Sequence, residues 1–250
     1  MNQQTKQYEG KMKRFHCIKR VVVFSFIMGL LGLLSCDDDS AKDTDDGTAN
    51  NEPGLVAHYP LDGNADDVGN SHSDGVVSGA VSANDRHDQV GKAMYFNGNS
   101  DFISVNDTSN FQFDDSLTVT AWVRTDSLKS QIVVRKGGGL AVPVFELYLA
   151  GNGDRGFRIG TNFTYKSGGY PLQTWMHLAG TYDGESMVFY INGSPVDTLQ
   201  KSNALTSDKN LLLIGTRTGL NADTFAGRLD DIRIYSRSLS LSEIAAMAAE

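Results

Sequence analysis

Short runs of alternating apolar and polar residues fill the chain from Leu55 onward and constrain its fold more than any other feature. About eleven such runs, among them "LTVTAWVRT", "VFELYLAG" and "SMVFYING", are separated by Gly, Asn and Asp. Adjacent strand side chains point to opposite faces, so this alternation is typical of half-buried β-strands. The Asn-Gly pair in "INGSP" predicts a tight hairpin turn. The spacing of the runs predicts an all-β antiparallel β-sandwich or jelly roll.

The last residues follow a different pattern. In "SLSEIAAMAAE", Ser240 and Glu243 have the spacing of a capping box and precede helix-forming alanines. The pattern predicts a short C-terminal helix. The chain has 250 residues, of which 40% are hydrophobic, and it shows no internal repeat. One domain of ordinary globular composition is expected.

The first thirty-five residues are expected to lie outside that domain. A basic segment, "KMKRFHCIKR", precedes an apolar run of about fourteen residues, "VVVFSFIMGLLGLL". A membrane-spanning helix needs roughly twenty apolar residues, so the pattern predicts a signal peptide over residues 1–35. The following "LLSC" resembles the lipobox of bacterial lipoproteins, which implies lipidation of Cys36 and anchorage in a membrane. A plain secretory signal is the alternative, and Met1 and Met12 are both possible starts.

Residues 36–53 are predicted to be a disordered tether that begins at the lipidated cysteine. Residues 37–52 hold seven acids, one lysine and no large apolar side chain, so they cannot form a core. Acids directly after the cysteine resemble the export signal of Bacteroidetes-type surface lipoproteins, which implies the outer membrane or cell surface of a Gram-negative bacterium. Whether the protein faces outward or into the periplasm stays open.

Charge argues against one class of partner. Residues 53–250 carry 22 acids against 15 lysines and arginines. Nucleic-acid binding needs a basic face, so it is not expected.

Six blocks of residues 54–250, in this order along the chain, carry a family resemblance: "GLVAHYPLDGNADDVGN", "GKAMYFNGNSDFISV", "SLTVTAWVRT", "TWMHLAGTYDGESMVFYINGSPV", "LLLIGT" and "FAGRLDDIRIYSRSLSLSEI". They resemble the laminin-G-like, concanavalin A-like jelly-roll domains of bacterial secreted proteins. The resemblance implies two curved antiparallel sheets with the first and last strands adjacent, and a bound calcium ion in many members. It leaves the function open, because the fold hosts lectins, glycosidases and adhesion modules.

Two adjacent acids, Asp230 and Asp231, stand inside the last strand run, "GRLDDIRIYS". Simple alternation places Asp230 in step with Ile232 and Ile234, so at least one carboxylate needs a partner on a buried side. Pairing of the first and last strands would bring Asp230 near the turn "DGNADD". A structural Ca²⁺, which prefers hard oxygen ligands, is therefore predicted. Its expected ligands are Asp62, Asn64, Asp67 and Asp230, with Asp66 nearby.

Simpler interpretations of the same acids stay open. Asp, Asn and Gly are abundant in turns, so residues 62–67 can form turns without a metal. Asp230 can then accept backbone hydrogen bonds, and Asp231 can pair with Arg233 or Arg228.

Catalysis by a glucanase-type carboxylate pair is not predicted. Retaining glycosidases need two carboxyl groups about 5–5.5 Å apart, which on a strand means acids two or four residues apart. The pattern Glu-x-Asp-x-x-Glu is absent, and Glu146 has no acid at either spacing. The sequence also lacks the Gly-x-Ser-x-Gly and His-Glu-x-x-His motifs. No catalytic residue is proposed.

Strand phases instead suggest a binding face. In "PVFELYLAG", Phe145 and Leu147 are expected to point inward, which leaves Glu146 and Tyr148 outward, and in "GFRIGT" the same alternation leaves Arg158 outward. The predicted ligand-binding residues are Glu146, Tyr148 and Arg158 on strands, with Tyr165 and Tyr170 in the following loop. Rings and planar polar groups suit sugars, although a solvated sheet face with a Glu146–Arg158 pair is an equally simple reading.

The function expected from these observations is non-catalytic carbohydrate binding by a lipid-anchored surface protein. The partner would be a polysaccharide or another glycan. A protein-binding adhesion or scaffold domain is the alternative, and a glycoside hydrolase of the same fold is a third.

Overall fold

The structure is a computed structural model that describes residues 52–106, 108–137, 142–200, 205, 209–218 and 223–250. Every described residue belongs to one compact unit, Asp46–Glu250. The predicted signal peptide, Cys36 and almost all of the predicted tether lie outside the described residues. Within the described part, no helix is long and apolar enough to cross a membrane.

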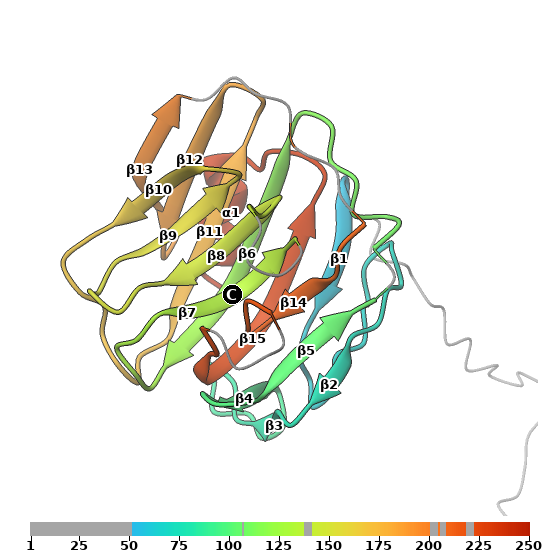
Figure 1. Cartoon of the computed structure of the whole chain (residues 1–250), viewed down its shortest axis with the longest axis vertical. Helices are drawn as coiled ribbons and strands as arrows, with labels where there is room; N and C mark the ends of the chain where they lie inside the picture. The colour runs from blue at the N-terminus through green and yellow to red at the C-terminus, as the bar shows by residue number, and fades with distance from the viewer. Residues whose placement is uncertain (1–51, 107, 138–141, 201–204, 206–208, 219–222) are drawn as a thin grey trace, which may run out of the picture. The chain divides into compact units, whose positions relative to one another are not determined.

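The described chain forms two antiparallel sheets that lie face to face (Figure 1). The larger, eight-stranded sheet has the order β13-β12-β11-β6-β15-β4-β3, with β1 paired to β15 beside this path. Its strands are β1 (Leu55–Tyr59), β3 (Val81–Ala83), β4 (Ala93–Asn97), β6 (Leu117–Thr125), β11 (Met176–Tyr182), β12 (Ser186–Ile191), β13 (Ser194–Gln200) and β15 (Ala226–Tyr235). The pairing of β1 with β15 confirms that the first and last strands are adjacent.

The smaller, seven-stranded sheet has the order β10-β9-β8-β7-β14-β5-β2. Its strands are β2 (Val76–Ser78), β5 (Phe102–Val105), β7 (Gln131–Lys136), β8 (Phe145–Leu149), β9 (Arg155–Ile159), β10 (Asn162–Lys166) and β14 (Leu212–Ile214). The prediction of an all-β antiparallel sandwich is confirmed.

The main core lies between the two sheets. It takes the inward-facing residues of both, including Val119 and Val123 of β6 and Phe145 and Leu147 of β8, which are fully buried. Burial of such apolar side chains supplies most of the favourable free energy of folding. Because alternate residues of β8 and β9 enter this core, the residues between them face outward, away from the larger sheet.

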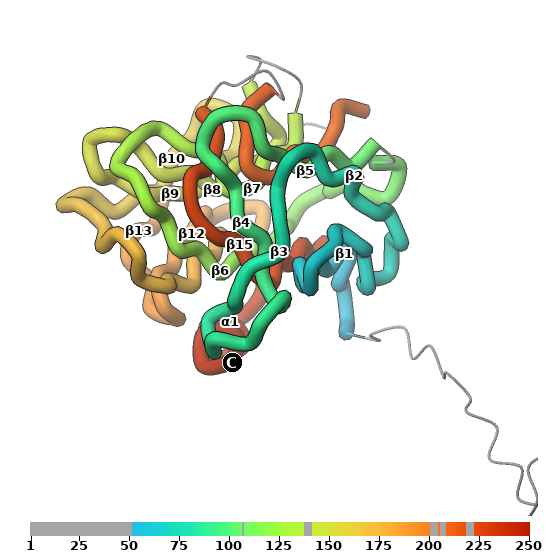
Figure 2. The backbone as a smooth tube through the Cα atoms, turned by 90° about the horizontal axis from the view of Figure 1, so that it is seen from below, coloured from blue at the N-terminus to red at the C-terminus, as the bar shows by residue number. Residues whose placement is uncertain are grey.

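Local signals in the sequence place two elements correctly. Asn192 and Gly193 both have positive φ, 48° and 77°, as the turn between β12 and β13 requires. The helix α1 (Leu241–Met247) begins with the predicted capping box of Ser240 and Glu243. It packs on the outer face of the larger sheet, on the side away from β7 and β8 (Figure 2), through Ile244 and Met247.

A β-bulge in β15 changes the predicted phase of the two aspartates. The pairing of β15 with β6 shifts register between Asp230 and Arg233, and Asp231 has a φ of 50°. As a result Leu229 and Ile232 enter the core, while both carboxylates lie on the outer face of the larger sheet. The expectation that Asp230 follows Ile232 and Ile234 is therefore wrong, because an extra residue in a strand reverses the alternation beyond it.

Candidate functional site

The outer face of the smaller sheet gathers the polar and aromatic side chains predicted for binding. Glu146 of β8 is the register partner of Arg158 of β9, and Arg158 is in turn the partner of Phe163 of β10. One step along the strands, Tyr148, Gly156 and Tyr165 form a second row. The outward orientation predicted for Glu146, Tyr148 and Arg158 is confirmed, because their neighbours along the strands are core residues.

Glu146 is the centre of an arginine cluster. It is 2% exposed and accepts a hydrogen bond from Nη1 of Arg135, the residue opposite it on β7. Nη1 of Arg158 lies 3.9 Å from its Oε1, and Nη1 of Arg217 lies 3.8 Å from its Oε2. Three guanidinium groups thus surround one carboxylate. The simple reading of a solvated Glu146–Arg158 pair does not hold, because Glu146 is buried and its short partner is Arg135.

Aromatic rings lie beside this cluster. The Arg158 guanidinium lies 4.8 Å from the centroid of the Phe163 ring, and Phe163 meets Tyr148 edge to face at 6.2 Å. Phe163 is 44% exposed and Tyr165 is 48% exposed. Gly156 leaves the space that Tyr148 occupies, because a Cβ atom there would lie 2.7 Å from the Tyr148 hydroxyl. The absence of a side chain at Gly156 of β9 therefore lets the Tyr148 ring lie over the sheet.

Glu146, Tyr148, Arg158 and Phe163 line a cavity of about 190 Å³, whose wall also includes Ser130, Gln131 and Arg217. Burial raises the pKa of Tyr148 to about 12, with smaller contributions from the negative charges of Asp154 and Glu146. Burial also lowers the pKa of Arg158, and Glu146 opposes that effect. At neutral pH the cavity therefore presents a neutral phenol and charged guanidinium groups.

Two predicted residues lie elsewhere than expected. Tyr165 belongs to β10 and not to a loop, and its backbone N–H donates to Asp197 of β13 at 2.9 Å. Tyr170 is 6% exposed and packs in the main core, with its hydroxyl donating to the carbonyl of Ala150 at 3.3 Å. The expectation that Tyr170 forms part of a surface is wrong, because the loop folds its ring inward.

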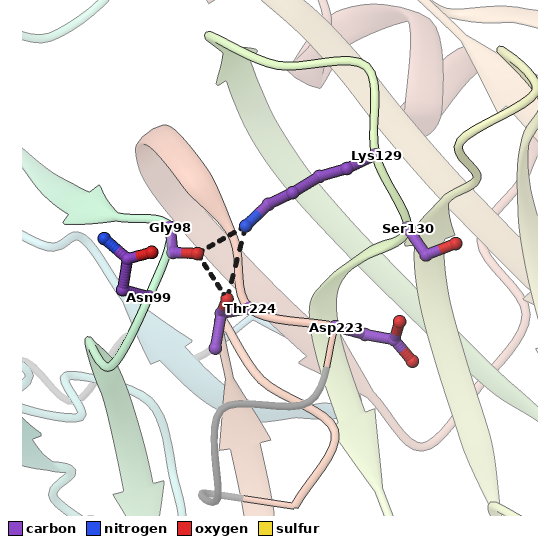
Figure 3. A pocket seen from close by; sticks show the side chains of 6 residues that line it. All are labelled: Gly98, Asn99, Lys129, Ser130, Asp223 and Thr224. Atoms are coloured by element: carbon purple, nitrogen blue, oxygen red, sulfur yellow. Dashed lines mark hydrogen bonds between the residues drawn. The ribbon is translucent and has the colours of Figure 1, made fainter.

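A second cavity, of about 400 Å³, adjoins the first (Figure 3). Ser130 lines both, and Asp223 of the second cavity accepts a hydrogen bond of 2.5 Å from Nε of Arg217 of the first. Lys129 points across this cavity and donates to the carbonyl of Gly98 and, at 3.3 Å, to the Thr224 hydroxyl. Amide, hydroxyl and ammonium groups thus continue the polar surface beyond the aromatic rings.

The four residues predicted to bind calcium have separate partners. Asp62 is paired with Lys92 at 2.5 Å, Asn64 donates to Asp66 at 2.6 Å, and Asp230 is paired with Arg86 at 2.6 Å. Asp67 accepts backbone hydrogen bonds from His58, Gly69 and Ser73 and one from the Ser71 hydroxyl.

No group of three or more His, Cys, Asp or Glu is placed to hold a metal ion among the described residues. Cations or N–H donors already occupy oxygens of the three predicted carboxylate ligands, so this donor set does not fit one shared Ca²⁺. Calcium binding stays a prediction. Asp231 pairs with Arg233, as the alternative interpretation allowed, and with His58 at 2.7 Å.

Three residues of the cavity and its arginine cluster are not predicted from the sequence, namely Arg135, Phe163 and Arg217. Alternation in "QIVVRK" offers no reliable phase for Arg135, because β7 also contains a register shift against β8. Phe163 falls in a segment expected to be a loop, although "NFTYK" alternates over five residues and could have been identified as a strand. Arg217 lies beyond β14, and only the tertiary structure brings it to Glu146.

The two sheets, their strand order and the polar cavity on one outer face define a concanavalin A-like β-sandwich. A model of the concanavalin A-like lectin/glucanases superfamily matches residues 97–245, more than half of the chain. The chain belongs to this superfamily.

Solved structures with a similar fold support this classification. Domain 4 of AbnA, a GH43 extracellular arabinanase from Geobacillus stearothermophilus, in complex with arabinotriose, is 20% identical with a TM-score of 0.62. The match covers 78% of this chain and 98% of that one. The binding domain of Paraclostridial Mosquitocidal Protein 1 is 18% identical (TM-score 0.62), and the match covers 78% of this chain and 52% of that one. The binding domain of botulinum neurotoxin DC in complex with SialylT is 13% identical (TM-score 0.61), with 78% and 51% covered.

Proposed function

We propose that this domain binds carbohydrate without cleaving it, through the outer face of the smaller sheet. The ligand would be a polysaccharide or another glycan. Phe163 and Tyr165 offer exposed rings to the apolar C–H face of a sugar, and Arg158, Arg217 and Ser130 offer polar groups to its hydroxyls.

The observation that carries this proposal is the combination of Phe163, Tyr148 and Arg158 in one cavity. The exposed Phe163 ring contacts both the Arg158 guanidinium and the Tyr148 ring, which it meets edge to face. A ring fixed in this way loses little conformational entropy when a ligand packs on it. The arabinotriose bound by the arabinanase domain and the SialylT bound by the neurotoxin domain support a glycan ligand by analogy of fold.

The arrangement favours binding over catalysis. The two carboxylates in the adjoining cavities, Glu146 and Asp223, are each held by an arginine. A general acid or a nucleophile needs a carboxyl group with access to the substrate, and Glu146 is buried behind Arg158 and Arg217. The alternative of a protein-binding adhesion domain would use a broader surface than these two cavities.

We further propose that the domain is carried on the outer membrane or cell surface by a lipid on Cys36, as the N-terminal sequence predicts. Metabolic labelling with a fatty-acid analogue tests this directly. Label on the full chain that disappears in Cys36→Ser supports the anchor, and an unlabelled native chain contradicts it.

Binding of the purified full chain to a panel of plant, bacterial and host polysaccharides tests the function. We expect retention on at least one class of glycan, with no release of reducing sugar. Phe163→Ala should weaken that binding about tenfold or more, as a central contact residue does. Tyr95→Ala is the matched control, because Tyr95 is a comparably exposed ring (36%) on the other sheet. Equal binding by Phe163→Ala and the native chain would contradict this site.

A further inference from the structure

The arginine cluster brings three charged guanidinium groups together, which a site for neutral sugars does not need. Arg135, Arg158 and Arg217 all lie around Glu146, and Asp223 is the one other carboxylate that a described contact joins to the cluster. Among the described residues, three guanidinium groups and two carboxylates thus meet at the cavity, on a domain whose overall charge is negative.

The partly exposed arginines keep donors available. Arg158 donates through Nε to the carbonyl of Gly160 at 2.7 Å, and Arg217 donates through Nε to Asp223. Their Nη1 atoms lie 3.8–3.9 Å from Glu146, beyond hydrogen-bond distance. Within the described residues no hydrogen bond is made by the terminal nitrogens of either side chain. Both side chains line the cavity, and they are 18% and 23% exposed.

We infer that the cavity binds an acidic glycan, with the carboxylate or sulfate of one sugar unit held between Arg158 and Arg217. This inference rests on the proposed function and names the class of ligand. A guanidinium fork matches the geometry of a planar carboxylate or of two sulfate oxygens, and such charge-assisted hydrogen bonds are the strong ones. Glu146, already held by Arg135, positions the two forks and leaves their outer N–H groups to the ligand.

The surroundings fit an acidic sugar within a longer chain. On one side of the arginines, Phe163 and Tyr165 present exposed rings. On the other side, Ser130 leads to the larger cavity with Asn99, Lys129 and Thr224. A neighbouring sugar can pack on the rings, and a further one can hydrogen-bond in the larger cavity.

The test uses matched pairs of polymers that differ only in charge. The full chain is titrated by calorimetry with polygalacturonate and its fully methyl-esterified form, and with a sulfated galactan and the same polymer after desulfation. We expect at least one acidic polymer to bind tenfold or more tightly than its neutral partner, because charge-assisted hydrogen bonds are worth that much or more. The preference should fall as salt is added. Which pair shows it identifies the anion as carboxylate or sulfate.

Three variants locate the effect. Arg158→Gln and Arg217→Gln should each reduce the acidic-to-neutral affinity ratio about tenfold. Asp223→Asn should raise affinity for the acidic polymer several-fold, a gain that damage to the fold cannot produce. Asn tolerates the positive φ of 50° at this position. Arg124→Gln is the control, because Arg124 is an arginine of similar exposure (22%) paired with Asp126 on the larger sheet.

The outcomes separate the two proposals. Tight binding of neutral polymers with no preference for their acidic partners overturns the acidic-glycan inference and leaves carbohydrate binding standing. A preference for acidic polymers that Arg158→Gln and Arg217→Gln do not change overturns the assigned site. No binding to any glycan by the folded native chain overturns both proposals.

Discussion

The outer faces of the two sheets carry charged clusters that differ in how closely their charges are paired. On the larger sheet, Asp230 and Asp231 are 3% and 8% exposed and are paired with Arg86, Arg233 and His58 at 2.6–2.9 Å. On the smaller sheet, Arg158 and Arg217 approach Glu146 only to 3.8–3.9 Å. Charges paired at hydrogen-bond distance have little left for a ligand, whereas the Nη atoms of Arg158 and Arg217, which make no hydrogen bond among the described residues, can bind one. The comparison assigns a structural role to the first cluster and recognition to the second.

The two clusters also differ in the segments and rings that lie beside them. The cluster on the larger sheet lies beside the C-terminal segment, where Glu250 accepts a 2.6 Å hydrogen bond from Arg233, and Arg86 lies 5.1 Å from the Trp122 ring centroid. Trp122 itself lies half-buried on this face. Rings on the smaller sheet instead remain exposed. The C-terminal segment thus covers part of the larger sheet, where His58, Arg86, Asp231 and Arg233 still line a cavity of about 270 Å³.

The largest expected effect comes from breaking the paired cluster. Asp231→Asn should lower the free energy of unfolding by about 3 kcal/mol, because it removes the anionic partner of half-buried His58 and leaves half-buried Arg233 with Glu250 alone. Asn accepts the positive φ of this position, so the change isolates the lost charge. Denaturant unfolding measures the effect. Glycan affinity of the folded variant should stay unchanged, and a stability equal to that of the native chain would contradict the structural role.

Two buried groups of this face, Asp230 and His177, have shifted pKa values; the His177 ring lies 5.4 Å from that of Trp122. Burial lowers the pKa of His177 to about 4, below its usual 6.5, so the unfolded state binds more protons between these values and stability is lost as pH falls from 6.5 to about 4. Burial raises the pKa of Asp230 to about 6, so the folded state binds its proton first and stability is gained as pH falls from 6 to about 3.8.

Single substitutions should expose these opposing effects. As pH falls from 6.5 to 4, His177→Gln should gain stability relative to the native chain. As pH falls from 6 to 4, Asp230→Asn should lose stability relative to the native chain. Each change is on the order of 3 kcal/mol. Denaturant unfolding across this pH range provides the measurement. The sign of each pH-dependent difference, and not the stability at one pH, decides the outcome, and parallel pH profiles for all three proteins would contradict both assignments.

A smaller effect is expected from filling the space above β9. In Gly156→Ala the new Cβ would lie 2.4 Å from the backbone oxygen of Thr164 and 2.7 Å from the Tyr148 hydroxyl. We expect a loss of about 1–3 kcal/mol in stability and weaker glycan binding, because Tyr148 must move. Gly151→Ala is the control, since its nearest neighbour would be 3.5 Å away. Equal thermal midpoints and affinities for the two variants would show that Gly156 does not position Tyr148.

The smallest effect concerns the predicted calcium site. Because Asp62 is paired with exposed Lys92, where water screens the charges, Lys92→Gln should leave the thermal midpoint almost unchanged. On the same geometry, added calcium or a chelator should leave the thermal midpoint unchanged. A rise of several degrees with calcium, removed by Asp62→Asn or Asp230→Asn, would instead support the calcium prediction and contradict the ion pairs as the resting state of these residues.

Strand faces, the hairpin turn and the helix cap could be predicted from the sequence, because they depend on neighbouring residues. Alternation in "VFELYLAG" and "GFRIGT" placed Glu146, Tyr148 and Arg158 outward correctly, because adjacent strand residues must face opposite sides. The Asn192–Gly193 hairpin and the capping box of α1 were equally predictable, since a positive φ and a cap are local requirements.

Contacts between residues far apart in the sequence could not be predicted, because they depend on how the strands pair and pack. The bulge at Asp231 moved both aspartates to one face, and a bulge depends on pairing with β1 and β6, which no local pattern encodes. Arg135 and Arg217 reach Glu146 from other strands and loops, while Tyr170 turns into the core. Alternation along a strand specifies on which face of the sheet a side chain lies. It does not specify which side chains of other strands and loops lie beside it. Long-range register therefore determined which side chains form the cavity.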